Sequence, residues 1–92
     1  MSRLPNLSAR DVAKRLHKLC FKEERQKGSH LTLGRSTGEK VTLPVHGDRE
    51  LSRGVVKQVI NLLEDRFNYT RPEAIEFLRT GRPLKIDCPL TY

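Results

Sequence analysis

Two short segments of alternating polarity constrain this chain most strongly. Within residues 30–34 and 40–46, apolar and polar side chains alternate with a period of two, which is typical of strands with one buried face. Residues 36–39 supply the turn between them. His30 and Thr32 lie on the polar side of this predicted hairpin and should face solvent. The opposite side forms a single apolar face: Leu31, Leu33, Val41, Leu43 and Val45.

Two segments with helical periodicity flank these strands. Ser8 and Asp11 have the spacing of a capping box, and apolar residues then recur every three or four positions, which predicts a helix over residues 9–19. Ser52 caps a second such segment, which we predict to be helical over residues 53–64. Both helices need an apolar surface to pack on, and the hairpin face is the one available.

Two further elements complete the predicted order. Residues 21–26 are predicted to form a first strand, because the turn signal Lys27-Gly28-Ser29 follows them. A short helix is predicted at about residues 71–80, between a capping box at Thr70 and a glycine at position 81 that suits a left-handed cap.

The predicted fold is therefore α+β, with the α-β-β-β-α order of double-stranded-RNA-binding domains. It has a three-stranded antiparallel sheet with both main helices on one face, followed by the short C-terminal helix. We expect a core over residues 1–67 and a C-terminal extension over residues 68–92.

The charge of the chain favours a polyanionic partner. It has 92 residues, enough for one domain, and 18 Lys and Arg against 11 Asp and Glu give a net charge of +7. With three Phe, two Tyr and no Trp, recognition of the nucleic-acid backbone is favoured over base stacking. The longest apolar run is three residues, so no membrane span or export signal is predicted.

The two cysteines, Cys20 and Cys88, do not predict a metal site. They have no paired spacing, and His17 with Cys20 would supply only two ligands, too few for zinc. We expect no metal and no cofactor. Two thiols and no export signal predict a cytoplasmic protein. The sequence does not indicate an oligomeric state.

His30 is the candidate catalytic residue. An imidazole that faces solvent can transfer protons near neutral pH, although a histidine without any role would look the same. Gly28 would let a phosphate approach the backbone, and Arg25 and Lys27 add positive charge. Such a set is sufficient for RNA cleavage, because the ribose 2′-hydroxyl is the nucleophile and needs only a base and cations.

A second basic group begins the second predicted helix. Arg53 and Lys57 lie one turn apart there, with Arg49 just before, and the helix N-terminus also favours phosphate. We predict a phosphate clamp at Arg53 and Lys57, the alternative being a solvated face of a basic protein. His46 is a weaker candidate for contact with a substrate or partner, and His17 is expected to be structural or inert.

Three motifs together resemble one family. Residues 25–30, Arg-Gln-Lys-Gly-Ser-His, are similar to the R-x-x-G-[ST]-H signature of HicA/YcfA-like toxins. Residues 43–46 resemble their [VL]-P-x-H strand end, and residues 51–54 their L-x-x-G-[TV] second helix. The likeness covers about residues 8–63. It departs from the family at residues 31–33, where aromatic residues or histidine often follow the signature, and residues 68–92 have no counterpart in it.

The resemblance implies a function. Members of this family are mRNA interferases with a fold like that of double-stranded-RNA-binding domains, and HicB-type antitoxins hold them inactive by covering the active surface. It implies that His30 is catalytic and that Gly28 and Ser29 shape its loop.

We therefore expect a metal-independent RNA endonuclease that acts on mRNA, with Arg25, Lys27, Arg53 and Lys57 holding phosphates. A non-catalytic RNA-binding module is the alternative. A plain protein-interaction domain would be favoured only if RNA affinity proved negligible.

Overall fold

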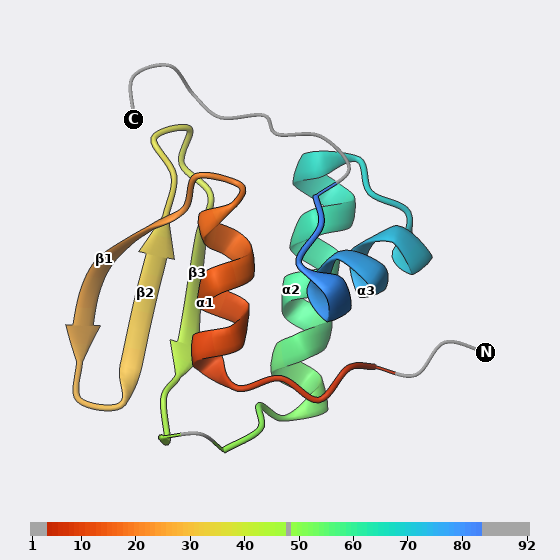
Figure 1. The fold of residues 1–92 in the computed structure, drawn as a ribbon. Helices are drawn as coiled ribbons and strands as arrows, with labels where there is room; N and C mark the ends of the chain where they lie inside the picture. The colour runs from red at the N-terminus through yellow and green to blue at the C-terminus, as the bar shows by residue number, and fades with distance from the viewer. Residues whose placement is uncertain (1–3, 48, 84–92) are drawn as a thin grey trace.

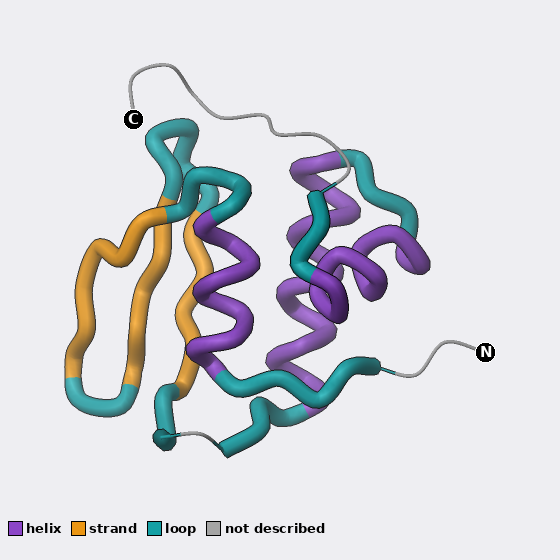
Figure 2. The backbone as a smooth tube through the Cα atoms, viewed as in Figure 1, coloured by secondary structure: helices purple, strands orange, loops and turns teal. Residues whose placement is uncertain are grey.

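The predicted order of elements is confirmed. In the computed structural model, which describes residues 4–47 and 49–83, the order is α1 (Ala9–His17), β1 (Lys22–Lys27), β2 (His30–Gly34), β3 (Lys40–Pro44), α2 (Arg53–Phe67) and α3 (Arg71–Thr80). The strands form one antiparallel sheet in the order β1-β2-β3, and the helices lie to one side of it (Figures 1 and 2). This α+β arrangement agrees with the fold class expected from the sequence. Cys88 and the rest of the predicted extension after residue 83 fall outside the described residues.

The strand register confirms the two faces of the hairpin. Leu31 pairs with Leu43, and both are buried, whereas His30 pairs with Pro44 and is exposed. Thr32 pairs with Thr42, and their hydroxyl oxygens lie 3.3 Å apart on the face away from the helices. We call this face the outer face of the sheet.

Helix starts follow the predicted caps. The Ser8 hydroxyl accepts a hydrogen bond from the Asp11 N–H (3.2 Å), and the Asp11 carboxylate accepts one from the Ser8 N–H (3.1 Å). The hydrogen bond from the Ser8 N–H is the main cause that lowers the pKa of Asp11. The ionised carboxylate therefore stabilises the folded state, and this contribution is lost only as the pH falls through the lowered pKa. Thr70 and Glu73 repeat the arrangement at α3.

The helix ends differ from the prediction for two of the three helices. α1 stops at His17, two residues early, and the chain turns through Cys20, whose φ of 68° is left-handed. α2 continues to Phe67, one turn beyond the predicted end, and stops where Asn68 adopts a φ of 58°. The extra turn adds the buried Phe67 ring to the core. α3 ends as predicted at Gly81 (φ 77°).

The predicted strand bounds are also close. β1 begins and ends one residue later than predicted, and β3 ends at Pro44, two residues early.

Cys20 is disulfide-bonded, so the expectation of two free thiols is wrong.

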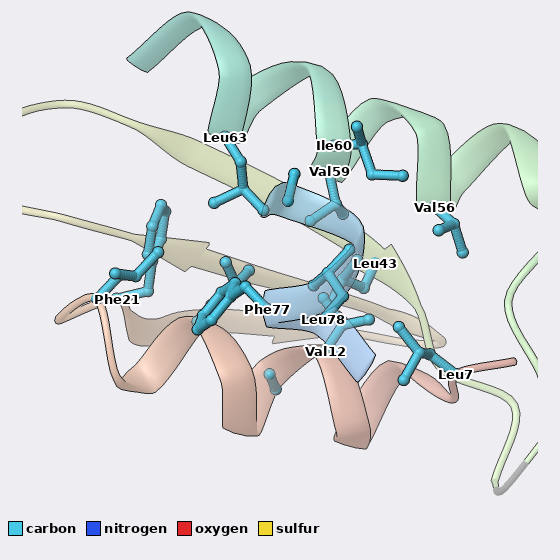
Figure 3. Packing of buried hydrophobic residues seen from close by; sticks show 14 of the residues in the cluster. Leu7, Val12, Phe21, Leu43, Val56, Val59, Ile60, Leu63, Phe77 and Leu78 are labelled. Atoms are coloured by element: carbon cyan, nitrogen blue, oxygen red, sulfur yellow. The ribbon is translucent and has the colours of Figure 1, made fainter. Parts of the chain in front are cut away.

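One continuous core joins the sheet to all three helices. Leu33 and Leu43 from the sheet, Leu16 from α1 and Leu63 from α2 are fully buried, and Figure 3 shows Phe77 of α3 among the core side chains. Burial of such side chains is the main favourable contribution to folding. α3 is thus packed on the core.

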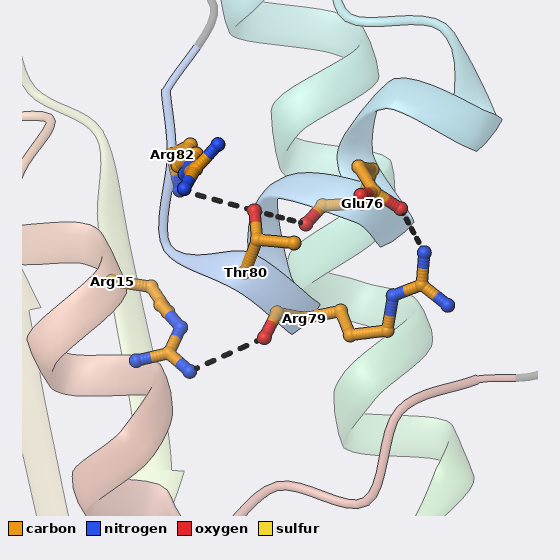
Figure 4. Close-up of polar contacts among 5 residues, drawn as sticks. All are labelled: Arg15, Glu76, Arg79, Thr80 and Arg82. Carbon is orange, nitrogen blue, oxygen red and sulfur yellow. Dashed lines mark hydrogen bonds and ion pairs between the residues drawn. The ribbon is translucent and has the colours of Figure 1, made fainter.

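Two basic side chains, Arg15 in α1 and Lys18 just after it, fix the end of α3. Arg15 Nε donates to the Leu78 carbonyl (3.0 Å), and Lys18 Nζ donates to the Gly81 carbonyl (2.6 Å). A longer contact joins Arg15 Nη2 to the Arg79 carbonyl (3.5 Å; Figure 4). These donors satisfy carbonyls at the helix end, where positive charge is also favoured by the helix dipole.

Arg35 connects the β2–β3 hairpin to the aromatic core. Its side chain is almost completely buried, with Cζ 4.7 Å from the ring centroid of Phe67 and 5.9 Å from that of Phe21. Arg35 Nη1 lies 3.7 Å from the Glu39 carboxylate. A hydrogen bond from the Thr37 hydroxyl, and to a smaller extent Arg35, lowers the pKa of Glu39, which keeps this carboxylate ionised.

Replacing Arg35 by methionine should therefore lower the free energy of unfolding by about 1–2 kcal/mol, since a desolvated cation–π contact and an ion pair are lost while the aliphatic stem is retained. Urea denaturation measures this change. Arg53→Met, at an exposed arginine, serves as the control and should change stability by less than about 0.5 kcal/mol. Equal effects of the two variants would contradict a role of the buried guanidinium.

Candidate nucleic-acid interface

The candidate residues gather at one end of the molecule. The β1–β2 turn at residues 28–29, the end of β3 and the first turns of α1 and α2 all lie at this end, at the bottom of Figure 1. We call it the hairpin end. The connection after β3 is held there because the Val45 N–H donates to the Ser29 carbonyl and the Leu51 N–H donates to the Leu7 carbonyl (2.7 Å).

His30 is exposed at the hairpin end, where it begins β2. Its cross-strand partners are Lys27 in β1 and Pro44 in β3, and Arg25 pairs with Thr32 two rows further along the sheet. Residues paired in an antiparallel sheet project to the same face. Lys27 and Arg25 are therefore on the outer face with His30, and both are exposed.

The turn before His30 leaves room for a ligand. Gly28 has a φ of 59°, a left-handed conformation that favours glycine, and open space surrounds the position of a Cβ there. Ser29 is half-buried, and its carbonyl accepts the hydrogen bond from Val45. The turn is thus held by the residue that follows β3, yet it is open on the side of Gly28, as close approach of a phosphate would require.

Arg53 and Lys57 form a separate group on α2. Both are exposed and one helical turn apart, and the first turn of α2 holds no acidic residue. The Ser52 hydroxyl accepts from the Val55 N–H (3.3 Å), which leaves other N–H groups of the first turn without a partner in the helix. The α2 N-terminus lies at the hairpin end, so Arg53 shares this end with His30, although the two belong to different elements.

Sequence reasoning missed a β-bulge on the outer face. The register shifts between Glu23 and Arg25, so Glu24 is the extra residue in β1. Its carboxylate lies over Gly34, where a Cβ would collide with it, and is 3.3 Å from Lys40 Nζ. The only hint in the sequence is the run of charged residues that replaces clean alternation in this strand.

Sequence reasoning also missed a groove between α1 and β1. All six residues of β1 are exposed, because the helices do not cover its inner side. A hollow of about 380 Å³ results, with α1 along one wall. Its lining residues are Arg10, Ala13, Lys14, His17, Glu23, Gln26, Leu31 and Val45. His17, expected to be structural or inert, is exposed and lines this groove. The spacing of residues 10, 14 and 17 on one helix face is the sequence signal that indicates a shared surface.

His46 is exposed in the connection that follows β3. Since the preceding residue bonds to Ser29, His46 also lies at the hairpin end.

No three His, Cys, Asp or Glu side chains come together as a metal site in the part of the chain that the structure describes. None of the helices described is both long and apolar enough to cross a membrane.

The fold and the exposed groups define a class of small basic α+β domain, in which an imidazole lies beside a cationic turn at one end of an open sheet. Residues 9–64 match the family described as the HicA toxin of bacterial toxin–antitoxin systems. The match covers more than half of the chain, so the protein belongs to the HicA toxin family and is a toxin of a toxin–antitoxin system. No significant match to a curated protein or to a solved structure is found.

Proposed function

We propose that this toxin is a metal-independent RNA endonuclease that cleaves mRNA in the cytoplasm and so inhibits translation. The observation that carries the proposal is the exposed His30 beside Lys27 at an open glycine turn. Family membership supports it, because it makes the protein a toxin whose partner is an antitoxin.

His30 would act as the general base. It takes the proton of a ribose 2′-hydroxyl, whose oxygen then attacks the adjacent phosphorus. The bond from phosphorus to the 5′-oxygen breaks, and this oxygen takes a proton from water. The products are a 2′,3′-cyclic phosphate and a 5′-hydroxyl end. Arg25 and Lys27, on the same face, would stabilise the negative charge that develops on the phosphate.

The test is incubation of the purified full chain with a long mRNA in excess EDTA, followed by analysis of the ends. Cleavage that persists in EDTA and leaves cyclic phosphates is the expected result. Binding of the RNA without cleavage would favour the alternative, a non-catalytic RNA-binding module that uses the same cations.

Arg53 and Lys57 are predicted to hold phosphates away from the reacting one. Replacing either residue by alanine should weaken RNA binding and reduce the slope of log affinity against log salt by about one, because one fewer counterion is released. Titrations at several salt concentrations measure this slope. Arg66→Ala, an exposed arginine in the last turn of the same helix, is the matched control and should leave the slope unchanged. A uniform effect of all three variants would indicate net charge rather than a clamp.

The proposed partner is an antitoxin of the HicB type. Lys27 and Arg53 are exposed at the hairpin end, so an antitoxin that presents acidic side chains there would cover His30 and neutralise the toxin. Such a complex should protect the amides of residues 28–31 from hydrogen exchange.

A further inference from the structure

The groove between α1 and β1 has a charge and a shape that suit a nucleotide. Arg10 and Lys14 give it two positive charges against the single carboxylate of Glu23. Neither cation forms an ion pair within the ranges 4–47 and 49–83, so both are available to a ligand. Its volume of about 380 Å³ falls in the range of roughly 300–1,000 Å³ that is typical of small-molecule sites.

The floor and the walls of the groove differ in polarity. The side chains of Ala13, Leu31 and Val45 supply apolar surface, on which a flat base can rest. Gln26 stands beside them on β1, paired across the sheet with Leu31. Its carboxamide carries both a donor and an acceptor, which is what the edge of a base requires.

The groove and His30 lie on opposite faces of the sheet but at neighbouring positions. Leu31 follows His30 directly and projects into the groove, while His30 projects from the outer face. The β1–β2 pairing ends next to them at the turn of residues 28–29, and the space around Gly28 in this turn is open. An RNA strand that passes around this turn would therefore meet both sites.

We propose that the α1–β1 groove binds a nucleotide of the RNA substrate that neighbours the cleaved phosphate, with Gln26 reading its base and Arg10 and Lys14 holding its phosphates. This inference rests on the proposed nuclease function and adds a site of sequence preference to it. A second groove, between β3 and α2, provides a contrast. It is of similar size, about 330 Å³, but Lys40 and Asp65 balance each other in its lining.

The experiment uses the full chain labelled with ¹⁵N and each of the four nucleoside 5′-monophosphates at millimolar concentration. The amides of Ala13, Gln26 and Leu31 should shift, more strongly with one base than with the others. Gln26→Ala should reduce the ratio of affinities between the best and the worst nucleotide by about tenfold, the discrimination expected from one bidentate contact. Gln58→Ala, which removes the same side chain from the second groove, should leave binding unchanged.

Mapping of RNA cleavage sites separates this inference from the nuclease proposal. The Gln26 variant should lose base preference at one position beside the cut, and the Gln58 variant should retain it. Nucleotide shifts confined to other surfaces, equal effects of the two variants, or an unchanged cleavage pattern in the Gln26 variant would each overturn the groove assignment while leaving the nuclease intact. Nucleotide binding in the groove without any RNA cleavage would instead overturn the nuclease and leave the groove as a nucleotide site.

Discussion

Replacing His30 by alanine is expected to reduce the rate of RNA cleavage by about 10²–10⁴-fold, the usual contribution of a positioned general base. The variant should also lose its inhibition of growth when expressed without the antitoxin. The fold should be unaffected, because the side chain is exposed at the first position of β2. Cleavage is measured in excess EDTA, with the amount of folded protein checked by circular dichroism.

Thr42→Ala is the matched control for the His30 variant. Thr42 is exposed on the same outer face and lies two rows away from His30, outside the residues proposed to bind or cleave RNA. It should retain full activity. If the His30 variant cleaved RNA at the normal rate, the histidine would have no place in the mechanism. If both variants lost activity equally, the surface of the sheet rather than the imidazole would be the cause.

Replacing Phe77 by alanine should lower the free energy of unfolding by about 3–5 kcal/mol, the cost that is typical when a large buried aromatic side chain is removed. Phe77 is 1% exposed, and its ring packs against Tyr69 with 5.8 Å between centroids. Because small domains are only marginally stable, a loss of this size should leave much of the protein unfolded at 37 °C. Thermal and urea denaturation followed by circular dichroism measure it.

Glu76→Ala tests whether any change in α3 has this effect. Glu76 neighbours Phe77 but is exposed, and its one ion pair within residues 4–47 and 49–83 is with the exposed Arg79, so its replacement should cost about 0.5 kcal/mol or less. A cost near zero for Phe77→Ala as well would show that α3 is an appendage to an independent core of residues 1–67. The large expected difference would instead make α3 part of the same cooperative unit, although the family match ends at residue 64.

The elements could be predicted because local signals and tertiary packing agree along most of the chain. The capping boxes at Ser8 and Thr70 and the cap at Ser52 mark the helix starts through hydrogen bonds within a few residues. The alternation in residues 30–34 places His30 opposite Leu31 and Leu33 without any knowledge of the rest of the fold.

The remaining features depend on contacts that no local pattern records. The burial of Arg35 requires Phe21 and Phe67, which come from two other elements. The bulge at Glu24 is stabilised by Lys40 across the sheet, and the α1–β1 groove exists because α1 leaves β1 uncovered. The roles of His30, Arg25, Lys27, Gly28, Ser29, Arg53 and Lys57 remain predictions. The structure gives their positions, and the experiments above test their functions.

The hydrogen bonds from Arg15 and Lys18 to the end of α3 have a consequence for synthesis of the toxin. Each joins residues 63 positions apart in the chain. Contacts of such long range form late in folding, and on the ribosome they must wait until both partners have emerged. The core therefore cannot close around α3 until residue 81 has emerged, so a ribosome that stalls before that point carries an unfinished domain with the α3-facing surfaces of α1 and α2 still uncovered.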